Sequence, residues 1–65
     1  MEKVKNIRAE KNLTLEDVAR RAGLSTGTVW QIETGRIQTS TVGTLEKLAR
    51  GLGVPLSELM PALKE

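Results

Sequence analysis

Few side chains in this sequence are equipped for covalent or acid–base chemistry. The chain has no histidine, cysteine or tyrosine, so it lacks the commonest general base, nucleophile and metal ligands. Its acidic residues fall at expected helix starts and on helix surfaces, where helix stability explains them. No glycine-rich motif that could cradle a phosphate is present in the sequence. We therefore expect no enzymatic activity, no cofactor and no metal site.

The remaining chemistry is hydrogen bonding, and it is concentrated in one segment that opens at Ser25. Serine is a strong helix N-cap and Gly35 can end a helix, so a helix is predicted over 26–34. Val29 and Ile32 lie three residues apart and can anchor this helix inward. The residues left on the mostly solvent-directed arc are Thr26, Gly27, Thr28 and Gln31.

A short connection joins this helix to the one predicted before it. Thr14 is a good N-cap, and Asp17 completes a capping-box pattern with an aspartate in the usual glutamate position. A helix is therefore expected over 15–22, and only the residues 23–25 separate it from the next helix. That spacing is typical of a helix-turn-helix connection. The inward face of the earlier helix is expected to carry Val18, Ala19 and Ala22.

The rest of the chain is predicted to be helical as well, because apolar residues recur at helical spacing and no segment alternates for long enough to form a half-buried strand. A first helix is expected over about residues 2–11, with Asn12 as a left-handed cap. A fourth follows a cap at Ser40 or Thr41, and a fifth begins near Pro55. The core residues of the first and fourth helices are expected to be Val4, Ile7, Leu45, Leu48, Ala49 and Leu52.

A chain of 65 residues forms a single domain, which we place at 1–65 with the helix-turn-helix at about 14–34. A domain of this size buries only about 60% of its unfolded surface, and neither disulfides nor zinc can add to its stability. Self-association would therefore stabilise it. No signal sequence or membrane-spanning stretch is visible, and the lack of cysteine fits a reducing cytoplasm. A net charge of +2 is by itself weak evidence for nucleic acid.

The helix junctions and core positions together follow the pattern of a known family. The segments that carry the pattern span nearly the whole chain in order: Leu13-Thr14, Val18-Ala19, Gly23-Leu24-Ser25, Val29, Ile32-Glu33, Gly35-Arg36, Ser40, Thr44-Leu45, Leu48-Ala49 and Leu52-Gly53-Val54. The chain thus resembles the Cro/phage-repressor family, also called the xenobiotic-response-element family. The resemblance implies an all-α, lambda-repressor-like bundle of five short helices. It further implies a sequence-specific regulator, most simply a repressor, whose second helix braces on the backbone of double-stranded DNA while the third enters the major groove.

The resemblance assigns contacts with base edges to the third helix. The residues concerned are Ser25, Thr26, Gly27, Thr28 and Gln31. Gln31 can pair with N6 and N7 of adenine, and Thr26 can offer a hydroxyl or pack its methyl group on thymine. Gly27 would permit close backbone approach where relatives usually carry a side chain.

Phosphate contacts are assigned by the same resemblance to the start of the second helix and to the loop after the third. The residues concerned are Thr14, Leu15, Thr34, Arg36 and Gln38. Helix N-termini attract anions without needing net charge. Two positions depart from the family: Leu15 replaces a frequent glutamine, which removes a side-chain contact but keeps the amide, and Thr39 replaces a frequent proline.

Two features between the helices have structural interpretations. Arg8 and Glu33 match positions that form a buried or half-buried ion pair in some relatives, and this role is preferred over a contact with DNA. Trp30 is the only aromatic residue and lies about 100° around the third helix from Val29. We expect a partly buried packing role for Trp30, with contact to the DNA backbone or to a dimer partner as the alternative.

The C-terminal apolar stripe predicts self-association. Its members are Leu56, Leu59, Met60 and Leu63. The first two are expected to close the core and the others to be surplus, which favours a two-fold dimer that uses this region and holds two recognition helices about 34 Å apart. Pro61 should break or kink the last helix. The main alternative is a protein-interaction module, such as an antitoxin, whose stripe and Trp30 face a toxin or another regulator. Binding of single-stranded nucleic acid is a weaker alternative, since it needs several exposed aromatic residues.

Overall fold

The computed structural model describes residues 1–37 and 41–59, and within these ranges the chain forms helices and turns but no strand. The elements in order are α1 (Glu2–Glu10), α2 (Leu15–Ala22), α3 (Thr26–Thr34), α4 (Val42–Leu52) and the one-turn 3₁₀ helix η1 (Leu56–Glu58). The all-α class is confirmed, and α2 and α3 have the predicted bounds. None of the helices in the described ranges is long and apolar enough to cross a membrane.

The start of α2 follows directly from its local sequence. The Thr14 hydroxyl accepts a hydrogen bond from the Asp17 amide at 3.0 Å, and the Asp17 carboxylate accepts one from the Thr14 amide at 2.9 Å. This reciprocal pair is the predicted capping box. Asn12 has the predicted left-handed conformation, with φ of 57°. The turn between α1 and α2 is therefore specified by residues within a few positions of it.

The capping box makes the stability of α2 dependent on pH. Hydrogen bonds from the Thr14 amide and hydroxyl, with a smaller contribution from Arg20, hold the pKa of Asp17 below its ordinary value of 3.8. A depressed folded-state pKa gives stability that is present above the unfolded pKa and is lost as the pH falls through the folded pKa. We expect Asp17→Asn to remove the loss of stability that this carboxylate causes at acid pH. Urea denaturation at a series of pH values below neutral measures the free energy of unfolding of both proteins. Parallel pH profiles for the variant and the wild type would contradict the assignment.

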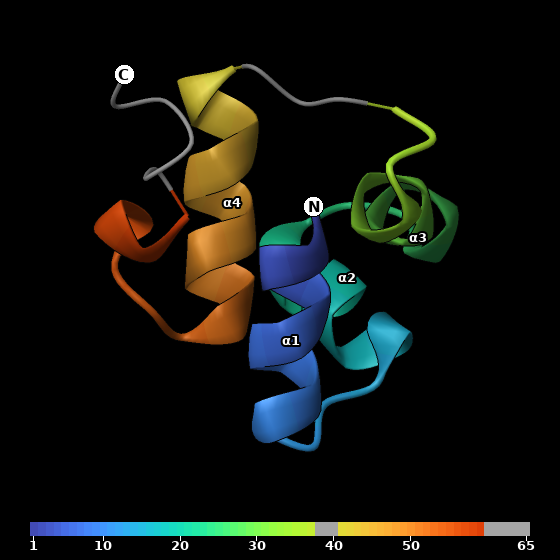
Figure 1. Cartoon of the computed structure of the whole chain (residues 1–65), viewed down its shortest axis with the longest axis horizontal. Coiled ribbons are helices and arrows are strands. Elements are labelled where there is room, and N and C mark those ends of the chain that lie inside the picture. Colours follow the sequence, from blue (N-terminus) through green and yellow to red (C-terminus); the bar gives the residue numbers. More distant parts are fainter. Residues whose placement is uncertain (38–40, 60–65) are drawn as a thin grey trace.

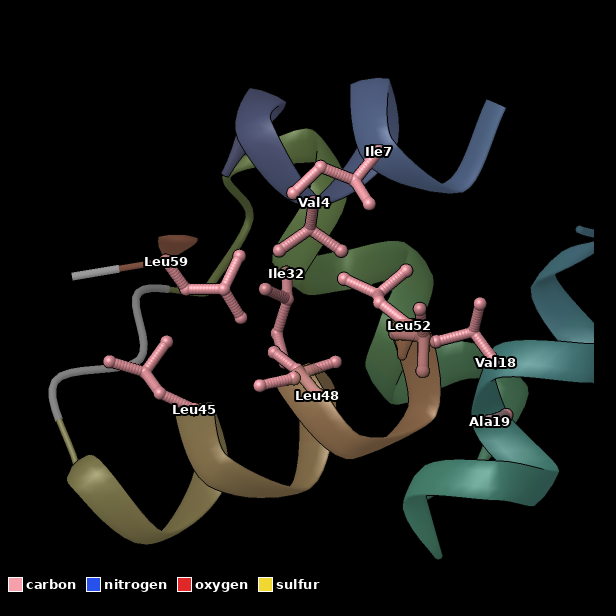
Figure 2. Close-up of a cluster of buried hydrophobic side chains, with 11 residues drawn as sticks. Val4, Ile7, Val18, Ala19, Ile32, Leu45, Leu48, Leu52 and Leu59 are labelled. Carbon is pink, nitrogen blue, oxygen red and sulfur yellow. The ribbon is translucent and has the colours of Figure 1, made fainter. Parts of the chain in front are cut away.

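A single apolar cluster joins all the helices (Figure 2). Val4 of α1 and Ile32 of α3 point toward Leu48 and Leu52 of α4, while Val18 enters from α2. The buried positions predicted for α1, α2 and α4 are all confirmed. Because Ile32 is almost completely buried in this cluster, the packing fixes which side of α3 faces the core.

The most extensive contact between helices is the crossing of α2 and α4. A Cβ atom built on Gly51 of α4 would lie 2.9 Å from the Val18 carbonyl oxygen and 3.1 Å from the Ala22 side chain. The backbones approach this closely because glycine and alanine occupy the crossing. Ala22, which the sequence places on the inward face of α2, therefore packs directly against α4.

The fifth helix expected near Pro55 is represented in the described residues by η1, a single 3₁₀ turn. A 3₁₀ helix has three residues per turn, so Leu56 and Leu59 fall on the same side and both pack on the core, where Leu59 is buried. One turn is therefore enough to cover this end of the cluster. Met60, Pro61 and Leu63 lie outside the described residues.

Candidate nucleic-acid interface

Helix α3 has one face in the core and the opposite face in solvent. Val29, Ile32 and Glu33 are buried, with Glu33 only 7% exposed. At about 100° per residue, the side of the helix away from these three is the one that carries the polar residues. The exposed residues of α3 are Thr26, Gly27, Trp30, Gln31 and Thr34. Figure 1 shows α3 almost end-on at the outer edge of the molecule, on the opposite side of α4 from η1.

The cap of α3 determines which of its hydroxyl groups are free. Ser25 accepts a hydrogen bond from the Thr28 amide at 3.1 Å and donates one to the Thr28 hydroxyl at 2.7 Å. The Ser25 hydroxyl is thus engaged within the protein by both the amide and the side chain of Thr28. Thr28 itself is half-buried, and Thr26 and Gln31 are exposed. The main hydrogen-bonding capacity toward a ligand therefore belongs to Thr26 and Gln31.

The N-termini of α2 and α3 differ in charge. The first turn of α3 contains no acidic residue, so the partial positive charge of its free amides is uncompensated. The first turn of α2 contains Glu16 and Asp17, and the Thr14 amide already donates to Asp17. Leu15 is half-buried against the core, although its amide has no acceptor within the helix. The start of α3 is consequently the better of the two sites for a negatively charged group.

The C-terminal end of α3 brings the chain back over the helix. Gly35 has φ of 81°, and its amide and that of Arg36 donate to the carbonyls of Ile32 and Gln31 at 3.3 and 2.9 Å. This Schellman motif fixes the backbone of Arg36 beside the last turn. The Thr34 hydroxyl donates to the Trp30 carbonyl at 2.9 Å, so its proton is not free for a phosphate in this conformation. Gln38 lies outside the described residues.

The expected packing role of Trp30 is wrong. Trp30 is 41% exposed and lies on the solvent face of α3, because Val29 and Ile32 occupy the inward positions on either side of it. The guanidinium carbon of Arg36 is 4.9 Å from the centre of the Trp30 ring. This distance is within the range of a cation–π contact. The sequence pattern does not indicate the pair, because the two residues lie on opposite sides of the turn at Gly35.

The ion pair expected between Arg8 and Glu33 is present. Arg8 Nε and Nη2 donate to the two carboxylate oxygens of Glu33 at 2.6 and 3.2 Å, and Nη1 donates to the Leu13 carbonyl at 2.8 Å. The Glu33 side chain is only 3% exposed. The pair links α1 and the turn after it to the rear of α3. Its role is therefore structural, and neither side chain lies on the exposed polar face.

The residues assigned to a dimer interface do not form one surface in the described part of the chain. Leu59 is 1% exposed and closes the core, as expected for the first two members of the stripe, so it is not available as a dimer-interface residue. Leu56 is half-buried and packs on the core from outside. Met60 and Leu63 lie outside the described residues.

A capped helix, a three-residue turn and a second helix with a buried rear and an exposed polar face define a helix-turn-helix protein. The model of the family described as "Helix-turn-helix domain" matches residues 2–62, and the chain belongs to this family. The predicted resemblance to the helix-turn-helix domains of the Cro/phage-repressor family is thereby confirmed.

Two relatives have names that bear on function. The chain is 38% identical over 58 residues to the cryptic phage CTXphi transcriptional repressor RstR of Vibrio cholerae, a match that covers 89% of this chain and 51% of that protein. It is 34% identical over 61 residues to the uncharacterized HTH-type transcriptional regulator RghRB of Bacillus subtilis strain 168, covering 94% of this chain and 44% of that protein. The chain thus spans about half the length of these relatives.

Proposed function

We propose that the chain is the sequence-specific, double-stranded DNA-binding domain of a transcriptional regulator, most simply a cytoplasmic repressor that occupies an operator. The observation that carries the proposal is that α3 has one buried and one exposed face: Val29 and Ile32 are buried, while Thr26 and Gln31 are exposed. A helix held rigidly by its rear face can enter the major groove without unfolding. The names of the two relatives, a transcriptional repressor and a transcriptional regulator, support the same function.

The proposed contacts divide into base reading and phosphate binding. Gln31 reads an adenine edge and Thr26 a thymine methyl or a base acceptor, while Gly27 lets the α3 backbone approach the bases. Arg36 and the amides that begin α2 and α3 hold phosphates, which set the orientation of the domain but carry no sequence information. A domain of net charge +2 can bind a duplex when its few cations and helix amide ends point toward the same side, and the proposal requires this of Arg36 and the two helix starts.

We further propose that two copies bind one operator. A homodimer with two-fold symmetry presents its α3 helices to half-sites about 34 Å apart, one turn of the duplex. The residues proposed for this interface are Leu56, Met60 and Leu63, of which only Leu56 belongs to the described part of the chain. Selection of bound duplexes from a random pool at defined salt tests function and symmetry together. A palindromic consensus supports both proposals. A consensus with a single half-site would contradict the dimer, and the absence of any enriched sequence would contradict sequence-specific DNA binding.

Two substitutions on the exposed side of the domain are expected to have different consequences. Gln31→Ala should relax preference at one base pair, a discrimination of about 1–3 kcal/mol. Arg36→Ala should weaken binding to all duplexes alike and lower the slope of log affinity against log salt concentration by about one. Binding titrations of the selected duplex and its single-base variants measure both effects. Asn6→Ala, an exposed change on α1, is the control and should bind like the wild type; equal effects of all three variants would contradict the assigned surface.

A further inference from the structure

The pair formed by Trp30 and Arg36 has no role in the core. Both residues are exposed, and the guanidinium carbon lies 4.9 Å from the ring centre. Neither side chain takes part in the buried cluster that joins the helices. Packing therefore does not account for a large aromatic side chain at this position.

Both members of the pair have backbones that are held in place. Trp30 stands in the middle of α3, one turn after Thr26 and on the same exposed side of the helix as Gly27 and Gln31. The Arg36 amide donates to the Gln31 carbonyl at 2.9 Å, which fixes its backbone beside the same helix. Since both backbones are fixed, the ring stays within reach of the end of a long side chain that would otherwise sample many rotamers.

We propose that Trp30 is a positioning residue for DNA binding: its ring holds the Arg36 guanidinium ready for a phosphate next to the groove that α3 occupies. This inference rests on the proposed function. Arginine is suited to the task because its planar guanidinium can stack on an aromatic face and still direct N–H groups at phosphate oxygens. Ordering the side chain before the encounter removes part of the entropy loss on binding.

A thermodynamic cycle on a mixed-sequence DNA duplex tests the proposal, because a phosphate contact does not depend on sequence. Trp30→Ala is expected to weaken binding about two- to fivefold, the range for an exposed cation–π contact. It should also lower the salt dependence toward that of Arg36→Ala. In the Arg36→Ala background, Trp30→Ala should have no further effect. Trp30→Phe keeps an aromatic face and should recover most of the affinity.

Two further measurements keep the interpretation unambiguous. Trp30 is the only tryptophan of the chain, so Arg36→Ala should shift its emission to longer wavelength in the free protein, where the stack is lost. The unfolding temperature of each variant should equal that of the wild type, since both side chains are exposed. A large fall in unfolding temperature with Trp30→Ala would assign Trp30 a structural role and overturn the proposal.

The remaining outcomes separate this inference from the proposed function. If Trp30→Ala weakens binding equally with and without Arg36, Trp30 contacts DNA itself and the positioning role is wrong, while the regulator remains supported. If Arg36→Ala leaves affinity and salt dependence unchanged, Arg36 holds no phosphate and the inference fails, whatever Trp30 does. If the wild type does not bind the mixed-sequence duplex at low salt, the proposed function fails as well.

Discussion

Replacement of Arg8 by alanine is expected to lower the free energy of unfolding by about 3 kcal/mol. The change would leave the Glu33 carboxylate, whose side chain is 3% exposed, buried without its partner, and losing one member of a buried pair typically costs about 3–5 kcal/mol. We take the lower end because the Arg8 side chain is 18% exposed and water can reach the vacated space. The Leu13 carbonyl also loses its hydrogen bond from Arg8. Urea denaturation at neutral pH measures the change.

The consequence is large for a domain of this size. A chain of 65 residues has about 3–10 kcal/mol of total stability at the usual amount per residue. Arg8→Ala would therefore remove about a third to all of this stability. Because the pair connects α1 to the rear of α3, DNA binding should be lost together with the fold and return when a stabilising condition restores it.

Two control variants isolate the buried charge as the cause. Arg20 pairs with Asp17 on the surface of α2, and the Arg20 side chain is 70% exposed. Arg20→Ala should therefore change stability by less than about 1 kcal/mol. The double variant Arg8→Met with Glu33→Leu removes both charges and should recover most of the stability lost in Arg8→Ala. An Arg8→Ala variant as stable as Arg20→Ala would show that Glu33 is not effectively buried.

Replacement of Gly51 by alanine is expected to lower the free energy of unfolding by about 1–3 kcal/mol, although alanine is the better helix former. The added Cβ would lie 2.9 Å from the Val18 carbonyl oxygen, a backbone atom that cannot rotate away. The added Cβ would also lie 3.1 Å from the Cβ atom of Ala22. Helices α2 and α4 must therefore separate slightly, and the contacts that hold the helix-turn-helix on α4 weaken with them.

Gly43 provides a matched control on the same helix. It lies near the start of α4, is exposed, and has no atom within 4 Å of an added Cβ. Gly43→Ala should therefore raise stability by up to about 1 kcal/mol through helix propensity alone. Denaturant unfolding should show that the free energy of unfolding falls in Gly51→Ala and rises in Gly43→Ala. If Gly51→Ala raised the free energy of unfolding as much as Gly43→Ala does, α2 and α4 would not cross as closely as described.

The local sequence determined where most elements begin and end. The Thr14–Asp17 capping box, the Ser25 cap and the left-handed Asn12 are interactions within three or four residues, so residue type and spacing are sufficient to predict them. Helical periodicity likewise identified the buried positions of α1, α2 and α4, because a compact helical chain has one core to which each apolar face must turn. The polar, exposed face of α3 follows from the same periodicity.

Only the tertiary structure decided which of these faces meet and how closely. The distance from Gly51 to Val18 depends on the crossing of two helices, and the Trp30–Arg36 stack depends on the rotamers of long side chains across a turn. The burial of Leu59 directly after η1 likewise depends on where the 3₁₀ turn meets the core. Residue type and spacing specify hydrogen bonds between neighbours in the chain, whereas contacts between elements arise from packing that no local pattern encodes.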